Sequence, residues 1–61
     1  MPWVTINMMD HHSDAQKKQL FTSVTEAVSQ ALDVPKEHVR IQLVEMNPKN
    51  HSIGGVPRSE E

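Results

Sequence analysis

The chain has 61 residues, no cysteine and a formal net charge of −2, and these values limit both its fold and its partners. A chain of this length forms one domain, here residues 1–61, and has neither a disulfide nor a thiolate zinc site to stabilise it. Because it buries only about 60% of its unfolded surface, we expect it to associate with other copies of itself.

The first predicted element is a strand over residues 2–9. Val4, Ile6 and Met8 recur at every second position, which is typical of a half-buried strand. Pro2 has the same parity and begins the strand, where a proline is tolerated because its missing N–H is not needed by the ladder.

A helix is predicted over residues 14–32. Ser13 and Gln16 have the spacing of a capping box, and Pro35 disfavours helix at the residue before it. Apolar residues recur at three- and four-residue spacings and form one stripe. The stripe comprises Leu20, Phe21, Val24, Ala27, Val28, Ala31 and Leu32.

A second strand is predicted over residues 39–46, followed by a turn and tail over 47–61. Two strands joined by a long helix form a parallel pair with a right-handed crossover. The predicted fold class is therefore α/β (α+β): a single βαβ protomer with two parallel strands and one long helix. A two-stranded sheet is unstable alone, so we expect oligomerisation to complete it.

The chain begins Met-Pro, and removal of Met1 would leave Pro2 with a free secondary amine. An α-amino group has an ordinary pKa of about 7.7–8.0, and burial or a nearby cation lowers that pKa. Such an amine can act as a general base near neutral pH. Taken alone, a second-position proline is more simply explained by chance.

Arg40 lies on the strand face opposite Ile41, and its planar guanidinium suits a bidentate grip on a carboxylate. His12 precedes the predicted helix N-terminus, where an anionic ligand is favoured. His11 and His12 point in different directions and no further ligand follows at a zinc-site spacing, so no metal is expected.

The charge and hydropathy of the chain predict its partners and location. There is no basic stripe, so nucleic acid is not an expected partner. No apolar segment could span a membrane, and no basic region followed by an apolar run opens the chain. We expect a cytoplasmic protein whose partners are a small molecule and its own copies.

Six short segments carry a resemblance to a known family. They are Met-Pro at 1–2, Ser-Asp-Ala-Gln-Lys at 13–17, Val-Thr-Glu-Ala-Val at 24–28, Val-Arg-Ile at 39–41, Glu-Met at 45–46 and Ile-Gly-Gly at 53–55. In this order and spacing the chain resembles the 4-oxalocrotonate tautomerase family from Pro2 to Gly55. The resemblance implies a hexamer built as three dimers, without a cofactor or metal.

The resemblance also implies an enol–keto tautomerase acting on a small 2-hydroxydienoate or 2-oxo acid. Pro2 would be the general base after Met1 removal, and Arg40 of a neighbouring subunit would hold the substrate carboxylate or the enolate. His12 stands where the best-known members have an arginine, and His51 where they have an aromatic residue. Both are candidate substrate-binding residues. Losing one permanent cation argues against a dicarboxylate and leaves a phenylpyruvate-like monocarboxylate open.

Two alternatives to the tautomerase remain open at this point. Pro2 could activate water for addition to an unsaturated or halogenated acid, as a hydratase or dehalogenase does, with Asp10 or Glu45 positioning the water. The chain could also be an oligomeric binding module without catalytic activity.

Overall fold

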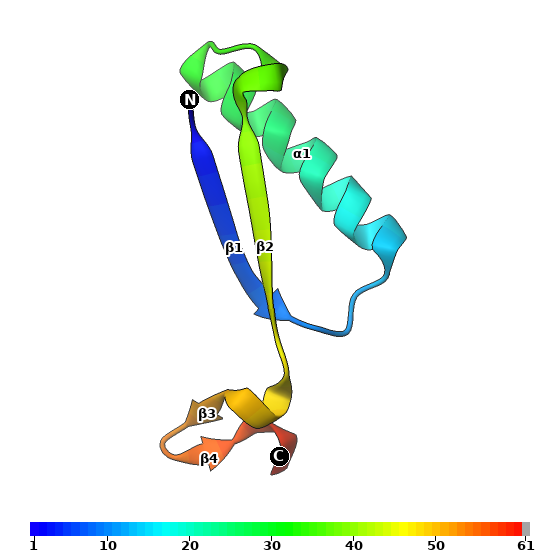
Figure 1. The fold of residues 1–61 in the computed structure, drawn as a ribbon, viewed down its shortest axis with the longest axis vertical. Helices are drawn as coiled ribbons and strands as arrows, with labels where there is room; N and C mark the ends of the chain where they lie inside the picture. Colours follow the sequence, from blue (N-terminus) through cyan, green and yellow to red (C-terminus); the bar gives the residue numbers. More distant parts are fainter. Residues whose placement is uncertain (61) are drawn as a thin grey trace.

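The computed structural model describes residues 1–60, which form a βαβ unit followed by a small hairpin (Figure 1). Strand β1 spans Trp3–Met9, helix α1 spans Asp14–Leu32 and strand β2 spans Arg40–Met46. The two strands run parallel, in a register that pairs Trp3 with Arg40 at one end and Met9 with Met46 at the other. The predicted arrangement of two parallel strands joined by one long helix is therefore confirmed.

Both long strands begin one residue later than predicted. The N–H of Val39 donates to the carbonyl of Lys36 at 3.1 Å and closes the 3₁₀ turn Lys36–His38, so the ladder does not use it. Pro2 has no N–H, but its carbonyl accepts from the N–H of Arg40 at 3.1 Å. Residue 2 therefore joins the ladder as an acceptor only.

Side-chain hydrogen bonds define both ends of α1. The Ser13 hydroxyl accepts from the Gln16 N–H at 3.1 Å, and the Gln16 side chain accepts from the Ser13 N–H at 2.9 Å. The predicted capping box is therefore confirmed. At the other end Asp33 is left-handed, with φ of 54°, and the Ser29 hydroxyl donates to the Val34 carbonyl at 2.6 Å. These bonds turn the chain toward β2.

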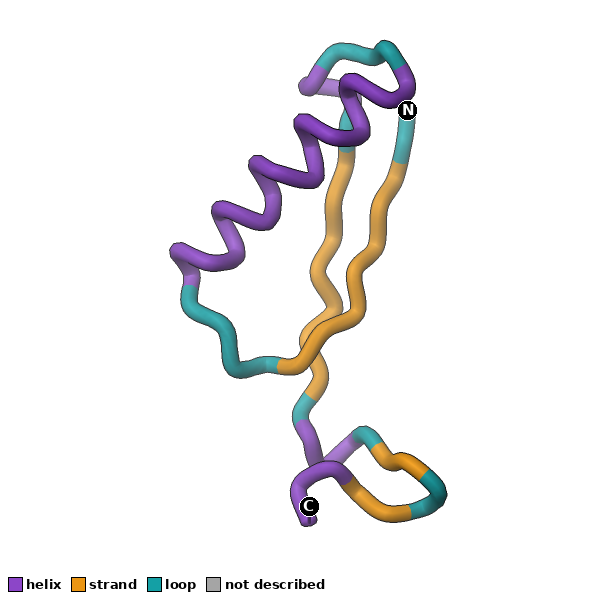
Figure 2. The backbone as a smooth tube through the Cα atoms, turned by 180° about the vertical axis from the view of Figure 1, so that it is seen from behind, coloured by secondary structure: helices purple, strands orange, loops and turns teal. Residues whose placement is uncertain are grey.

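Helix α1 lies along one face of the β1–β2 pair (Figures 1 and 2). The side chains between the two layers are half-buried: Val4, Ile6, Met8, Ile41, Leu43, Leu20, Val24 and Val28. The predicted helical stripe is wider than the surface that packs on the sheet. Phe21 and Leu32 are 38% and 57% exposed, because a two-stranded sheet is too narrow to cover them.

The other face of the sheet has no helix over it. It presents the odd-numbered residues of β1 and the even-numbered residues of β2, because paired residues in a parallel ladder share a face. Trp3 is 74% exposed and Val44 is 39% exposed on this face. Large apolar side chains in such positions are typical of a surface that another chain covers.

The accessible surface and the radius of gyration of the chain both indicate that it has no buried interior. Its accessible surface is 4693 Å², against about 4,000 Å² for a compact protein of this mass. Its radius of gyration is 14.7 Å, against about 10.5 Å for a compact domain of this length. None of residues 1–60 is buried. These values are those expected of a subunit that folds against its neighbours.

The tail contains more structure than the predicted turns. Strands β3 (Ser52–Ile53) and β4 (Val56–Pro57) form an antiparallel hairpin between the 3₁₀ turns Pro48–Asn50 and Arg58–Glu60. The two glycines at the tip have φ of 61° and 86°, the sign required by a tight two-residue turn. The hairpin projects beyond the carboxyl ends of β1 and β2 (Figure 1). Glu61 lies outside the described residues.

An ion pair joins the start of α1 to the end of β2. The Lys17 ammonium lies 2.7 Å from a Glu45 carboxylate oxygen, and this hydrogen bond raises the pKa of Lys17 above its ordinary value of 10.5. A raised pKa means that the folded state binds the proton more tightly than the unfolded state. The stabilisation is therefore fully present below pH 10.5 and is lost as the pH rises through the folded-state pKa.

We expect Glu45→Gln to lower the urea midpoint of unfolding at neutral pH. The difference from wild type should shrink toward zero as Lys17 loses its proton in alkaline solution, because the wild-type pair is then lost as well. Urea titrations at several pH values above and below 10.5 measure this difference, with Glu37→Gln as the matched control. A difference that stays constant across the series would contradict the pairing.

Candidate active site

Pro2 and Arg40 lie side by side at the amino-terminal edge of the sheet. Their backbones share the 3.1 Å hydrogen bond described above, and Arg40 is paired in register with Trp3. The Arg40 guanidinium carbon lies 5.8 Å from the centre of the Trp3 ring. Its Nη2 also lies 3.8 Å from the sulfur of Met1. The two residues predicted to carry the chemistry are therefore neighbours within one chain.

The nitrogen of Pro2 is the atom on which the predicted chemistry depends. While Met1 is attached, this nitrogen belongs to a peptide bond, and its lone pair is delocalised into the carbonyl. Release of Met1 would convert it into a secondary amine beside the permanent positive charge of Arg40. It would also remove the sulfur that contacts the guanidinium. Both changes would leave a free amine and the Arg40 guanidinium exposed at this end of the sheet.

His12 and His51 lie at the opposite end of the sheet. His12 is exposed in the loop between β1 and α1, and its ring stacks on that of His11 with centroids 5.0 Å apart. His51 is half-buried and follows β2 and the first 3₁₀ turn of the tail. Met9 is seven residues further along the chain than Pro2, a length of about 23 Å in an extended strand. One chain therefore does not bring the two histidines to Pro2.

His51 lines a hollow of about 250 Å³ at the carboxyl end of the strands. The other residues of this hollow are Asn7, Met8, Met9 and Met46. Met9 and Met46 are paired in the ladder and close the end of the sheet. Neither methionine was predicted to line a hollow. The predicted strands 2–9 and 39–46 are parallel and equally long, so pairing their last residues would have placed Met9 beside Met46.

The two carboxylates considered for positioning water also lie far from Pro2 in the chain. Glu45 faces the helix and is held by Lys17 at 2.7 Å, on the opposite side of the sheet from Arg40. Asp10 follows the last residue of β1 and is exposed. Neither Asp10 nor Glu45 stands near Arg40, so neither could position a water molecule beside Pro2 of the same chain.

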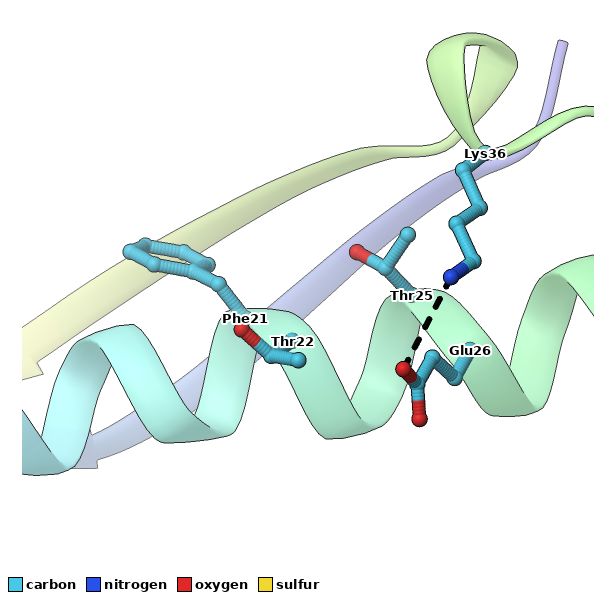
Figure 3. A pocket seen from close by; sticks show the side chains of 5 residues that line it. All are labelled: Phe21, Thr22, Thr25, Glu26 and Lys36. Atoms are coloured by element: carbon cyan, nitrogen blue, oxygen red, sulfur yellow. Dashed lines mark ion pairs between the residues drawn. The ribbon is translucent and has the colours of Figure 1, made fainter.

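A second hollow of about 290 Å³ lies along α1 (Figure 3). Its lining residues are Phe21, Thr22, Thr25, Glu26 and Lys36. The Lys36 ammonium and a Glu26 carboxylate oxygen are 3.7 Å apart, and both side chains are more than half exposed. None of the predicted site residues lines this hollow, so it is separate from the candidate active site.

Within residues 1–60 no three His, Asp or Glu side chains gather in a way that could hold a metal ion. No helix in the same range is both long enough and apolar enough to cross a bilayer.

The comparisons with known proteins agree with this arrangement of elements. A sequence profile of a family described as tautomerase enzyme matches residues 1–54. The chain belongs to the tautomerase enzyme family. It is therefore an enzyme of the isomerase class, and the predicted family is confirmed.

Relatives of this tautomerase match it over nearly their whole length. The 2-hydroxymuconate tautomerase of Pseudomonas putida is 46% identical over 61 residues, which cover 98% of this chain and 95% of the relative. The crystal structure of YwhB, a homologue of 4-oxalocrotonate tautomerase, superposes with a TM-score of 0.92 at 30% identity, covering 98% of each chain.

A third relative is a heterohexameric 4-oxalocrotonate tautomerase from Chloroflexus aurantiacus. Its structure superposes with a TM-score of 0.90 at 32% identity, covering 98% of this chain and 97% of that chain. The fold of this tautomerase is therefore found in a chain that assembles into a hexamer.

Proposed function

We propose that the protein interconverts the enol and keto forms of a small 2-hydroxydienoate or 2-oxo acid, with Pro2 as general base and Arg40 as the carboxylate clamp. The observation that carries this proposal is that Pro2 and Arg40 stand at the same end of the sheet, where the Arg40 N–H donates to the Pro2 carbonyl and the guanidinium lies against the Met1 sulfur. The family resemblance implies that the arginine acting on a given Pro2 belongs to a neighbouring copy. Tautomerase family membership supports the reaction type.

The proposed reaction moves one proton and needs no cofactor. The Pro2 amine takes the proton from the 2-hydroxyl group of the enol, and the electron pair of that O–H bond forms the new C=O bond. The displaced double-bond electrons take the same proton from the Pro2 ammonium onto carbon. The Arg40 guanidinium holds the carboxylate and stabilises the negative charge that develops on the enolate. The permanent charge of Arg40 also disfavours protonation of the free amine before the substrate binds.

We propose that the complete site forms between copies of the chain, in a homohexamer of three dimers. His12 and His51 are at the opposite end of the sheet from Pro2, so only another copy can bring them to the same site. The open sheet face and the lack of any buried residue among 1–60 support association on physical grounds. The heterohexameric relative supports assembly of six chains with this fold.

The two histidines favour a substrate with one carboxylate. An imidazole at position 12 lacks the permanent charge and planar fork with which an arginine grips a second carboxylate. We expect the enol of phenylpyruvate to be ketonised with a higher kcat/KM than 2-hydroxymuconate, the dicarboxylate named in the P. putida relative.

The measurement is the rate of ketonisation of both enols by protein whose intact mass shows that Met1 is absent. A higher kcat/KM for the dicarboxylate would contradict the proposed preference. Inactivity toward both enols, in a folded oligomer without Met1, would overturn the tautomerase proposal and favour a binding module. Hydration or dehalogenation of unsaturated acids by the same sample would favour the hydratase alternative.

A further inference from the structure

Trp3 occupies an unusual position for a large aromatic residue. It is the only tryptophan in the chain, it is 74% exposed, and it lies next to Pro2 at the edge of the candidate active site. No role for Trp3 was predicted from the sequence. Its direct neighbour across the ladder is Arg40, because each of them is the first residue of its strand.

The contact between Trp3 and Arg40 has the geometry of a cation–π interaction. The guanidinium carbon is 5.8 Å from the ring centre, within the roughly 6 Å over which an indole face attracts a cation. Both backbones are fixed by the same parallel ladder, so the contact requires no movement of either strand. The interaction therefore restricts a long side chain that would otherwise sample many rotamers.

The remaining contact of the Arg40 side chain explains why this restriction matters. The Met1 sulfur at 3.8 Å is the other side-chain partner of Arg40 found within residues 1–60, and it leaves with Met1. After that release Trp3 is the neighbour that still holds the guanidinium at the edge of the sheet. Without Trp3, the substrate would have to order the Arg40 side chain as it binds, and this entropy cost would weaken binding.

We infer that Trp3 is the positioning residue that holds the Arg40 guanidinium ready for the substrate carboxylate. This inference rests on the proposed function of Arg40 and adds a residue that the reaction itself does not require. Trp3 acts through Arg40 and takes no part in the proton transfer. Its loss should therefore raise KM much more than it lowers kcat.

The first test measures the contact without any substrate. Because Trp3 is the only tryptophan and the chain has no tyrosine, intrinsic fluorescence reports on Trp3 alone. We expect Arg40→Gln to shift the emission maximum or yield, and Arg40→Lys to shift it less, because lysine keeps a cation near the ring. Arg58→Gln is the matched control, since it makes the same change at the only other arginine. Identical spectra for wild type and Arg40→Gln would overturn the inference.

The second test measures the effect on catalysis. We expect Trp3→Leu to raise KM for a 2-oxo acid enol between about 2-fold and about 30-fold, the range expected for a cation–π contact, with little change in kcat. Trp3→Phe should restore most of the loss, because it keeps an aromatic face. In the Arg40→Gln background Trp3→Leu should have almost no further effect. Additive effects in that double variant would overturn the inference.

Light scattering and circular dichroism on each variant separate this role from a structural one. If Trp3→Leu fails to assemble, the kinetic comparison uses Trp3→Phe instead. The fluorescence measurements on the Arg40 variants do not require the Trp3→Leu protein. Loss of activity in Pro2→Ala tests the proposed function separately. The fluorescence measurement tests the contact between Trp3 and Arg40 whether or not the protein catalyses the proposed reaction.

Discussion

Replacing Pro2 with alanine, in protein from which Met1 has been removed, should lower kcat for enol ketonisation by about 10²- to 10⁴-fold, the usual contribution of a positioned general base. Alanine still leaves an amine at the same end of β1. That amine is primary, rotates freely and has more hydrogen atoms to hydrate than the ring nitrogen of proline. The expected residual activity above the uncatalysed rate therefore reflects this less effective amine together with Arg40 and substrate binding.

The measurement is single-substrate kinetics on samples whose intact masses show the same processing at residue 1. Pro35→Ala is the matched control, because Pro35 is exposed in the loop after α1 and carries no proposed role in the reaction. It should keep the wild-type kcat. If Pro2→Ala also keeps it, the secondary amine of Pro2 is not required, and the mechanism proposed for Pro2 fails whatever the substrate.

The second large effect concerns which copy of the chain supplies Arg40. Pro2→Ala and Arg40→Gln should each be nearly inactive alone. If a neighbouring subunit supplies the arginine, as the family resemblance implies, unfolding and refolding the two variants together should restore activity. Random assembly in equal amounts would give roughly a quarter of the sites both native residues.

Absence of restored activity in the mixed sample would contradict a shared site. It would assign the chemistry to the Arg40 of the same chain, which the structure places beside Pro2. Mass spectrometry of the intact assembly shows whether mixed oligomers formed, so a failure to mix is distinguished from a failure to complement. Mixing each variant with wild type provides the reference for dilution of active sites.

Local patterns were sufficient to predict the main elements of the fold. The alternation of Val4, Ile6 and Met8 and the Ser13–Gln16 capping box act over a few residues, and the structure contains both. The limits of the helix-facing surface were harder to predict. Phe21 has the right spacing for the apolar stripe, yet it is 38% exposed because the sheet under α1 has only two strands.

The candidate site was predictable only in part. The family resemblance, and not residue type alone, was needed to give Pro2 and Arg40 their predicted roles. Trp3 was not singled out, because its role depends on the register that pairs it with Arg40. The tail hairpin was also not predicted, because β3 and β4 have two residues each and are too short to show alternation.

The absence of buried residues within 1–60 also affects how the protein is made. We expect a chain without buried residues to have no stable folded monomer, so in the proposed hexamer folding and subunit encounter would be one process. The rate at which newly synthesised chains become native then depends on how often they meet, and it falls steeply when synthesis is slow. Local synthesis from one messenger RNA, which delivers many identical chains to the same place, would favour this encounter.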